Sequence, residues 1–112
     1  IDDARFAGGR VRSRREVSRR GRNFVRYELR TLGVAEQLIE DIMEEEYDEQ
    51  TERQLLMQLA VPYVGRAAAL EDPMLRKKEM EKIARRLLGK GFSSRLVFEI
   101  LSGLEESSRL DD

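Results

Sequence analysis

The sequence predicts an all-α protein made of tandem three-helix repeats, with two units forming an elongated and curved molecule. Apolar residues recur at helical spacing, and the pattern of one stretch returns 58 positions later. Charged residues make up 38 % of the 112 positions, against 40 % hydrophobic residues and only two prolines, a balance typical of helical domains. Each unit is too small for a large core of its own, so we expect the units to pack together.

The repeat is clearest in two helix pairs that each turn at a glycine. The first pair spans 22–44 and turns at Gly33, and the second spans 83–101 and turns at Gly91. Glycine suits the left-handed position that ends a helix, because it has no Cβ to clash there. Four positions are identical between the pairs: Leu29, Gly33, Leu38 and Ile42 match Leu87, Gly91, Leu96 and Ile100.

The first unit is expected over residues 1–46. The Asp2-Asp3 pair can cap a helix that runs to about Val17. A basic turn over 19–21 leads into the second helix. The third helix is expected to fray in the acidic run 44–46, where carboxylates face the unfavourable end of the helix dipole.

The second unit is expected over residues 47–106. Asp48 is a good cap for its first helix, whose apolar stripe continues across Pro62. Proline removes a backbone donor and clashes with the preceding turn. We therefore expect a kink or break near Val61.

Short polar signals delimit the last two helices. Asp72-Pro73 predicts a cap followed by proline at the first helical position. Lys90-Gly91 ends that helix, and Ser93 caps the next one. The residues from Glu105 onward are polar, so we expect a frayed end and a tail over 107–112.

Composition excludes several classes of function. The chain has no histidine and no cysteine, which removes the usual near-neutral acid–base group, the thiol nucleophile and disulfides. No GxxxxGK[ST] P-loop is present. No stretch approaches the roughly 18 apolar residues of a membrane span, and no signal peptide opens the chain. We therefore expect a cytoplasmic protein that is not an enzyme, with no cofactor, small-molecule substrate or membrane partner.

Charge is distributed unevenly along the chain. Residues 1–33 carry a net charge of +6, residues 34–60 carry −8 and residues 61–112 carry +1, although the whole chain has −1. Ten arginines in the first third exceed what solubility requires, which predicts a binding surface there. The alternative is a solvated face whose arginines pair with the acidic segment of the same molecule. Charge alone does not separate nucleic acid from an acidic protein partner.

The basic residues at helical spacing are the candidates for contact with DNA or a nucleoprotein filament. The planar arginine side chain suits phosphate and carboxylate alike. The candidates are Arg10, Arg12, Arg14, Arg15, Arg19, Arg22, Arg26, Lys82, Arg85, Arg86 and Arg95. Tyr27, flanked by Arg26 and Arg30, is the best placed aromatic residue for stacking on a base, although helix packing is the commoner role.

The acidic run Glu44, Glu45 and Glu46 is the candidate surface for a basic protein partner. Together with Asp48 and Glu49 it also has the carboxylates that Mg²⁺ or Ca²⁺ prefers. Its spacing fits no EF-hand loop, and a solvated helix end explains it better. We assign no metal site.

Two sets of short motifs lie at repeat spacing and resemble a known family. Segments IDDARFA at 1–7, VRSR at 11–14 and RYELRTLGV at 26–34 are similar to the second repeat of the RecX family of recombination regulators. The positions that match are Asp2, Asp3, Phe6, Ala7, Glu28, Leu29, Gly33 and Val34. Segment RRLLGKGFSSRLVFEIL at 85–101 resembles the third repeat, and its matching positions are Leu87, Gly91, Phe92 and Ser93. The resemblance covers about residues 1–104.

Three features depart from the family pattern. The family usually carries a repeat before the Asp-Asp pair, and this chain begins at Ile1 rather than methionine, so we expect a fragment. Arg10 stands where an aromatic or apolar residue is common. Pro62 and the long connection 61–72 are unusual in the third repeat, and they leave the path of the fourth helix open.

The resemblance implies a non-enzymatic regulator that binds the RecA recombinase filament, in homologous recombination, DNA repair and the SOS response. Family members lie along the filament groove and inhibit strand exchange, ATP hydrolysis and filament growth. Two other classes stay open. One is a general DNA-binding helical domain, for single- or double-stranded DNA, without a recombinase partner. The other is a helical scaffold whose charges serve solubility and self-association.

Overall fold

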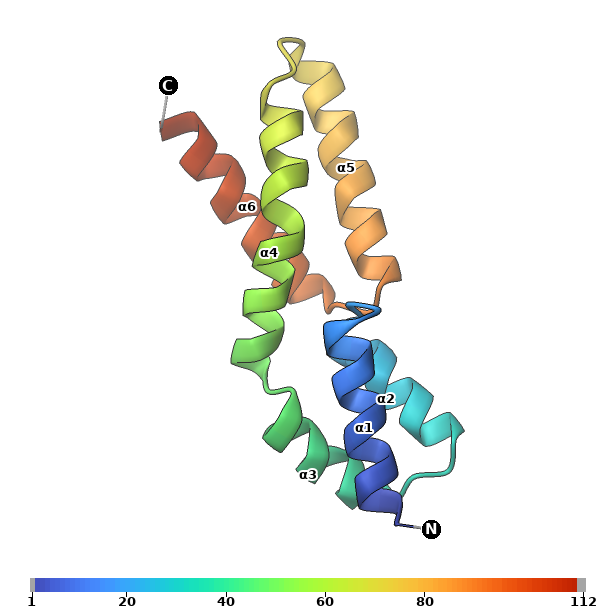
Figure 1. The fold of residues 1–112 in the computed structure, drawn as a ribbon. Coiled ribbons are helices and arrows are strands. Elements are labelled where there is room, and N and C mark those ends of the chain that lie inside the picture. Colours follow the sequence, from blue (N-terminus) through green and yellow to red (C-terminus); the bar gives the residue numbers. More distant parts are fainter. Residues whose placement is uncertain (1, 111–112) are drawn as a thin grey trace.

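The computed structural model describes residues 2–110, and within that range it contains six α-helices and no β-strand (Figure 1). The helices are α1 (Asp3–Glu16), α2 (Arg22–Thr31), α3 (Glu36–Glu46), α4 (Glu49–Ala68), α5 (Pro73–Gly89) and α6 (Ser94–Leu110). The molecule is elongated, with principal extents of 55 × 22 × 21 Å. The predicted all-α, elongated fold of tandem three-helix repeats is therefore confirmed.

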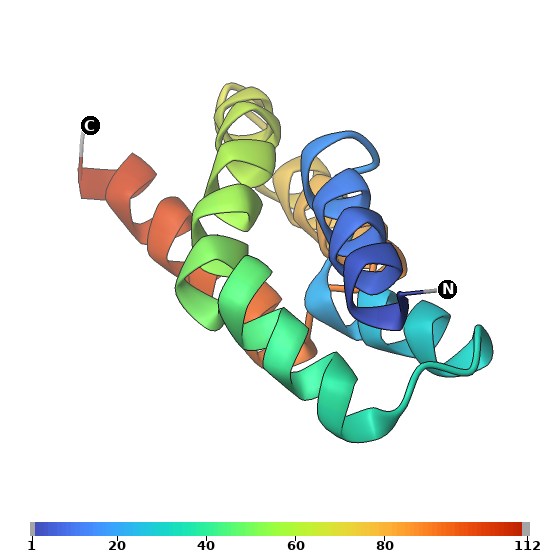
Figure 2. The ribbon, with the colours of Figure 1, turned by 60° about the horizontal axis from the view of Figure 1, so that its bottom comes forward.

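The helices form two groups that meet end to end. One group contains α1, α2 and α3, the other contains α4, α5 and α6, and only Tyr47 and Asp48 separate α3 from α4 (Figures 1 and 2). Both predicted glycine turns are present, because Gly33 has a φ of 85° and Gly91 a φ of 100°. The domain limits at 46 and 106 stay predictions.

Polar side chains cap the amino ends of four helices, as the sequence predicts. Each cap accepts a hydrogen bond from a backbone amide two or three positions later, which satisfies a donor that the helix itself leaves unpaired. The pairs are Asp2 with Arg5 at 3.2 Å, Asp48 with Thr51 at 2.8 Å, Asp72 with Met74 at 2.9 Å, and Ser93 with Leu96 at 3.2 Å.

One hydrophobic core runs through both groups. Corresponding positions of the repeat are buried in each, as Leu29 and Leu87 illustrate. Phe92 is buried, whereas Tyr27 is 69 % exposed, so the expectation that Tyr27 packs between helices is wrong. None of the helices in the described range is long and apolar enough to cross a membrane.

The sequence predicts a kink or a break near Val61, and the break is wrong, because α4 is continuous from Glu49 to Ala68; the kink stays a prediction. Pro62 lies on the exposed side of this helix, where water can bond the carbonyl group that loses its partner. The buried stripe of α4 continues on the opposite side through Ala60 and Val64. Packing of that stripe outweighs the local cost of the proline.

The predicted fraying from Glu105 is also wrong within the described residues, since α6 runs to Leu110. Leu104, directly before Glu105, packs against the core, and no proline or glycine follows it before residue 110. The last two positions of the predicted tail lie outside the described residues.

Two loops that are far apart in the sequence touch where the groups meet. The Gly21 amide donates to the Lys90 carbonyl at 2.9 Å, and the Asn23 amide donates to the Gly91 carbonyl at 3.2 Å. A Cβ on Gly21 would lie 2.3 Å from the Gly91 carbonyl carbon and from the Phe92 nitrogen. Glycine is therefore required at position 21 by close backbone approach, a role that the sequence does not reveal.

Two buried side chains complete this junction. The Tyr47 hydroxyl donates to the Arg20 carbonyl at 2.8 Å, and the Tyr47 ring is fully buried. The Glu52 carboxylate, only 4 % exposed, accepts the Arg22 amide at 2.8 Å. Glu52 thus caps α2 from a different helix, because Gly21 has no side chain for that purpose. Burial raises the pKa of the Glu52 carboxyl, and the hydrogen bond from Arg22 opposes that shift.

Candidate nucleic-acid interface

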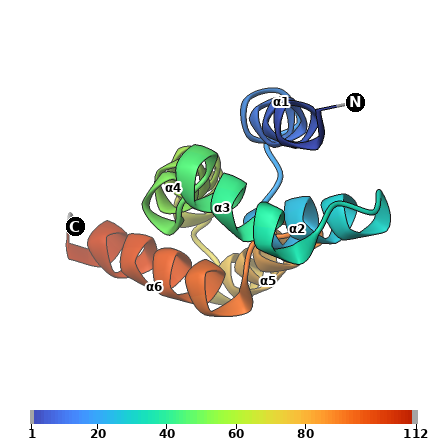
Figure 3. The ribbon, with the colours of Figure 1, turned by 90° about the horizontal axis from the view of Figure 1, so that it is seen from below.

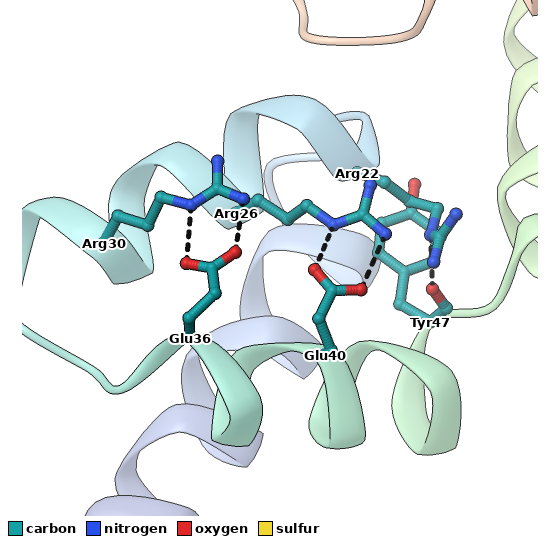
Figure 4. Close-up of polar contacts among 6 residues, drawn as sticks. All are labelled: Arg22, Arg26, Arg30, Glu36, Glu40 and Tyr47. Carbon is teal, nitrogen blue, oxygen red and sulfur yellow. Dashed lines mark hydrogen bonds and ion pairs between the residues drawn. The ribbon is translucent and has the colours of Figure 1, made fainter.

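The three arginines of α2 form a ladder along one face of that helix, against α3 (Figure 4). Arg26 donates to Glu40 at 3.1 and 3.3 Å, and Arg30 donates to Glu36 at 2.9 and 2.6 Å. The third member of the ladder, Arg22, donates to the Tyr47 carbonyl at 2.9 Å. We call Arg22, Arg26 and Arg30 the arginine ladder. In the sequence analysis, the alternative to a binding surface is that arginines pair with the acidic segment of the same molecule. Arg26 and Arg30 of the ladder do so.

Two arginines of α1 hold the carboxyl end of α3. Arg12 pairs with the Glu46 carboxylate at 3.0 Å, and Arg15 donates to the Glu46 carbonyl. Cations are favourable at this end of a helix, where carbonyl groups lack partners. Arg15 also pairs with Glu16 at 2.7 Å. These contacts explain why an acidic run at the end of α3 does not fray: α3 stays helical through Glu46.

A second set of cations gathers beside the junction around one carboxylate. Arg14 donates two hydrogen bonds of 2.8 Å to Glu28. These bonds hold the pKa of the Glu28 carboxyl below its ordinary value, and the charges of Arg10 and Arg20 act in the same direction. Lys90 reaches the adjoining loop from the other group, because its ammonium donates to the Ser18 carbonyl at 3.4 Å.

We call Arg10, Arg14, Arg20 and Lys90 the junction cluster. Three of its cations act on the single carboxylate of Glu28, and Lys90 reaches the adjoining Ser18 carbonyl, so the cluster keeps an excess of positive charge. Aromatic rings position two of its members: Arg20 lies over the Phe24 ring at 4.7 Å from the centroid, and Arg10 lies over Phe6 at 5.3 Å. Ring contacts of this kind hold a guanidinium group without neutralising it. The cluster can therefore bind an anion such as phosphate.

The candidates of the second group are dispersed. Arg95 pairs with Glu49 at 2.5 Å and with Glu99 at 3.4 Å, and Lys82 pairs with Glu79 at 3.9 Å. Arg86 lies over the Tyr63 ring and donates to its hydroxyl at 2.9 Å, and it forms no ion pair with a carboxylate in the part of the chain that the structure describes. Arg85 is exposed and makes no ion pair within residues 2–110.

The structure thus divides the predicted candidates. Arg10 and Arg14 enter the junction cluster, and exposed Arg19 lies next to it in the α1–α2 connection with a left-handed φ of 54°. Sequence reasoning missed Arg20 and Lys90 as members. The arginine density pointed to the first of these, but nothing in the sequence could place Lys90 beside Ser18, 72 positions away.

The acidic candidates are also divided. Glu46 is engaged by Arg12, whereas Glu44 and Glu45 are exposed and form no ion pair within the described range. Across residues 2–110, no three acidic side chains come together in an arrangement that suits a metal ion.

Comparison with known proteins gives one family match, over part of the chain. Residues 2–43, which comprise α1, α2 and most of α3, match the family described as RecX, second three-helix domain. No curated protein and no solved structure matches the chain. RecX is a family of regulatory, non-catalytic proteins. Residues 2–43 of this chain are therefore similar to the second three-helix domain of RecX.

Proposed function

We propose that this protein binds the RecA recombinase filament and modulates, mostly by inhibition, its DNA strand exchange and ATP hydrolysis. The observation that carries the proposal is the match of residues 2–43 to the second three-helix domain of RecX. The similarity of residues 85–101 to the third repeat supports it, since the two motifs stand in the family's order. The elongated shape, 55 Å long, suits a protein that lies along a filament and contacts several protomers.

The junction cluster is the surface that we assign to the DNA strand within the filament. Four cations with a single carboxylate among them, that of Glu28, attract phosphate, and their attachment to two different helix groups spreads them over a wider area than one helix offers. Arg19 adds a further exposed cation in the same connection. The ladder residues Arg22 and Arg26, together with Arg12 and Arg15, would have to release their partners in α3 or Tyr47 before they bound phosphate.

A separate surface is assigned to protein. Glu44 and Glu45 are exposed on α3, without ion pairs in the described range, and they suit a basic patch on a RecA protomer. The elongated fold therefore offers basic and acidic surfaces to a partner that itself combines nucleic acid with protein.

The test is co-sedimentation with RecA assembled on single-stranded DNA with a non-hydrolysable ATP analogue. Bare DNA and free RecA are the comparison lanes. Pelleting with the filament well above both supports the proposal, and its absence refutes the proposal for this chain. Equal pelleting with bare DNA supports the second candidate, a general DNA-binding domain, which the charge excess of the junction cluster favours on its own.

Two double variants with the same loss of charge locate the surface. Arg10→Gln with Arg20→Gln removes half of the junction cluster, whereas Lys82→Gln with Arg85→Gln removes two exposed cations of α5. We expect only the first pair to weaken pelleting, and to reduce the log–log salt slope by about 1 to 2. Equal weakening by both pairs contradicts the assignment of the junction cluster.

A further inference from the structure

The second helix group contains an apolar groove of about 590 Å³ between α4, α5 and α6. The helices α5 and α6 diverge from their turn, and α4 crosses the opening between them (Figures 1 and 3). Val64 and Ala67 of α4 line its floor, and Met80 of α5 and Phe98 of α6 line its walls. Phe98 is 55 % exposed, which is a large aromatic surface to leave in water.

The groove is not a by-product of the repeat. In the repeat, α5 and α6 correspond to α2 and α3, 58 positions earlier, but they are longer. The start of α5 corresponds to position 15, whereas α2 begins at 22, and the end of α6 corresponds to position 52, whereas α3 ends at 46. The extra turns supply Arg76 and Lys77 at one end of the groove. The first group has no counterpart of these extra turns, so the basic end of the groove is specific to the second group.

The two cations that line the groove lie next to each other on α5, whereas its two acidic lining residues, Glu81 and Glu105, come from α5 and α6. Arg76 and Lys77 lie near the amino end of α5, a helix with no acidic residue in its first turn, and neither makes an ion pair within residues 2–110. The carboxylate of the neighbouring Asp72 is occupied as the helix cap. The helix dipole adds to the positive potential at this end. Glu81, which also lines the groove, lies one turn further along α5 and disfavours acidic groups there.

We propose that this groove binds a short amphipathic helix of a partner protein, with the partner's carboxylates at Arg76 and Lys77. A helix fits a groove between diverging helices, where it inserts large apolar residues spaced three or four positions apart. Its apolar face packs against Phe98 and Met80, and its acidic end lies at the amino end of α5. The proposal goes beyond RecA binding and does not depend on it.

The probe is a fluorescein-labelled peptide of about 14 residues, four helical turns, with Leu and Phe on one face and three Glu at one end. A scrambled peptide of the same composition and a peptide with Lys in place of Glu are the controls. Fluorescence anisotropy against the 112-residue chain measures binding. We expect the acidic amphipathic peptide to bind and both control peptides to fail.

Variants of the chain locate the peptide. Phe98→Ala, and Arg76→Gln combined with Lys77→Gln, should each weaken binding about tenfold, because they remove an aromatic anchor or the charge partners. Tyr27→Ala is the matched control for an exposed aromatic residue. Lys78→Gln with Arg85→Gln is the matched control for charge on α5. Both controls should stay within about twofold of the original affinity.

Three results would overturn the proposal. The scrambled peptide binds as well as the designed one, Phe98→Ala binds like the unmodified chain, or the chain forms a concentration-dependent dimer that Phe98→Ala abolishes. The last result would assign the groove to a second copy of this chain. Because Phe98 is largely exposed, its removal leaves the core intact, and circular dichroism of each variant checks the fold.

Discussion

Replacing Gly21 by alanine tests the contact between the two helix groups most directly. The backbone at Gly21 has φ −75° and ψ 166°, which any residue adopts, so alanine meets no conformational strain there. Its methyl group, however, would lie 2.3 Å from backbone atoms of Gly91 and Phe92. No side-chain rotation relieves an overlap with backbone. We therefore expect the junction to open and the free energy of unfolding to fall by about 3 kcal/mol.

Three other glycines separate steric overlap from backbone strain. Gly33 has a φ of 85°, and no atom lies within 4 Å of the position that a Cβ would take, so alanine there meets strain alone and costs about 1 to 2 kcal/mol. Gly91 combines a φ of 100° with a Cβ position 2.4 Å from Phe24, so its replacement costs about 4 kcal/mol. Gly65 lies inside α4 with neither problem, and alanine there should gain about 1 kcal/mol.

Denaturant unfolding followed by circular dichroism ranks these four variants. The expected order of stability is Gly65→Ala, the unmodified chain, Gly33→Ala, Gly21→Ala and finally Gly91→Ala. If Gly21→Ala were as stable as the unmodified chain, the two loops would not touch as described, and the reasoning would be refuted. Gly33→Ala as the most damaging change would equally contradict it, because that position carries strain without contact.

Three further predictions concern single side chains. Pro62→Ala should raise the free energy of unfolding by about 2 kcal/mol, because an exposed proline inside α4 is replaced by a better helix former, and a lower melting temperature would contradict this. Tyr47→Phe should cost about 1 to 2 kcal/mol in denaturant unfolding, because the Arg20 carbonyl loses the donor that the buried Tyr47 side chain supplies, and an unchanged midpoint would show that water replaces the hydroxyl. For Glu28, whose pKa is lowered from 4.5 by Arg14, the stabilisation is present above that value and lost as pH falls through the folded pKa. The stability difference between the unmodified chain and Glu28→Gln should therefore shrink between pH 7 and pH 3, and a constant difference would contradict the assignment.

The helices could be predicted from the sequence because their signals are local. Aspartate or serine caps and glycine stops act within one turn, and apolar periodicity determines which side of each helix is buried. The predictions that were wrong concern features that depend on packing between helices far apart in the sequence. Pro62 stays helical because the opposite side of α4 is buried, and Tyr27 is exposed because no helix covers it.

The candidate binding surface was predictable only as a composition. The sequence located an excess of arginine in residues 1–33 but could not tell which guanidinium groups would find carboxylates. Steps of three or four positions place Arg22, Arg26 and Arg30 on one face, and the fold then turns that face towards α3. Whether an arginine can bind a partner molecule therefore depends on which helix packs against its side of the helix. The periodicity of the sequence does not specify that helix.

The sequence by itself determined the fold class, the internal repeat, the helix caps and the likeness of the first unit to RecX. Each of these depends on local motifs and on the helical spacing of apolar residues, which the sequence shows directly. Only the tertiary structure decided how the two groups meet. Gly21 and Gly91 approach within backbone contact, Glu52 caps a helix that begins 30 positions earlier, and Lys90 joins cations of the first group. Contacts of this length depend on how whole helices pack, and packing depends on the combined shape of many side chains rather than on any local pattern.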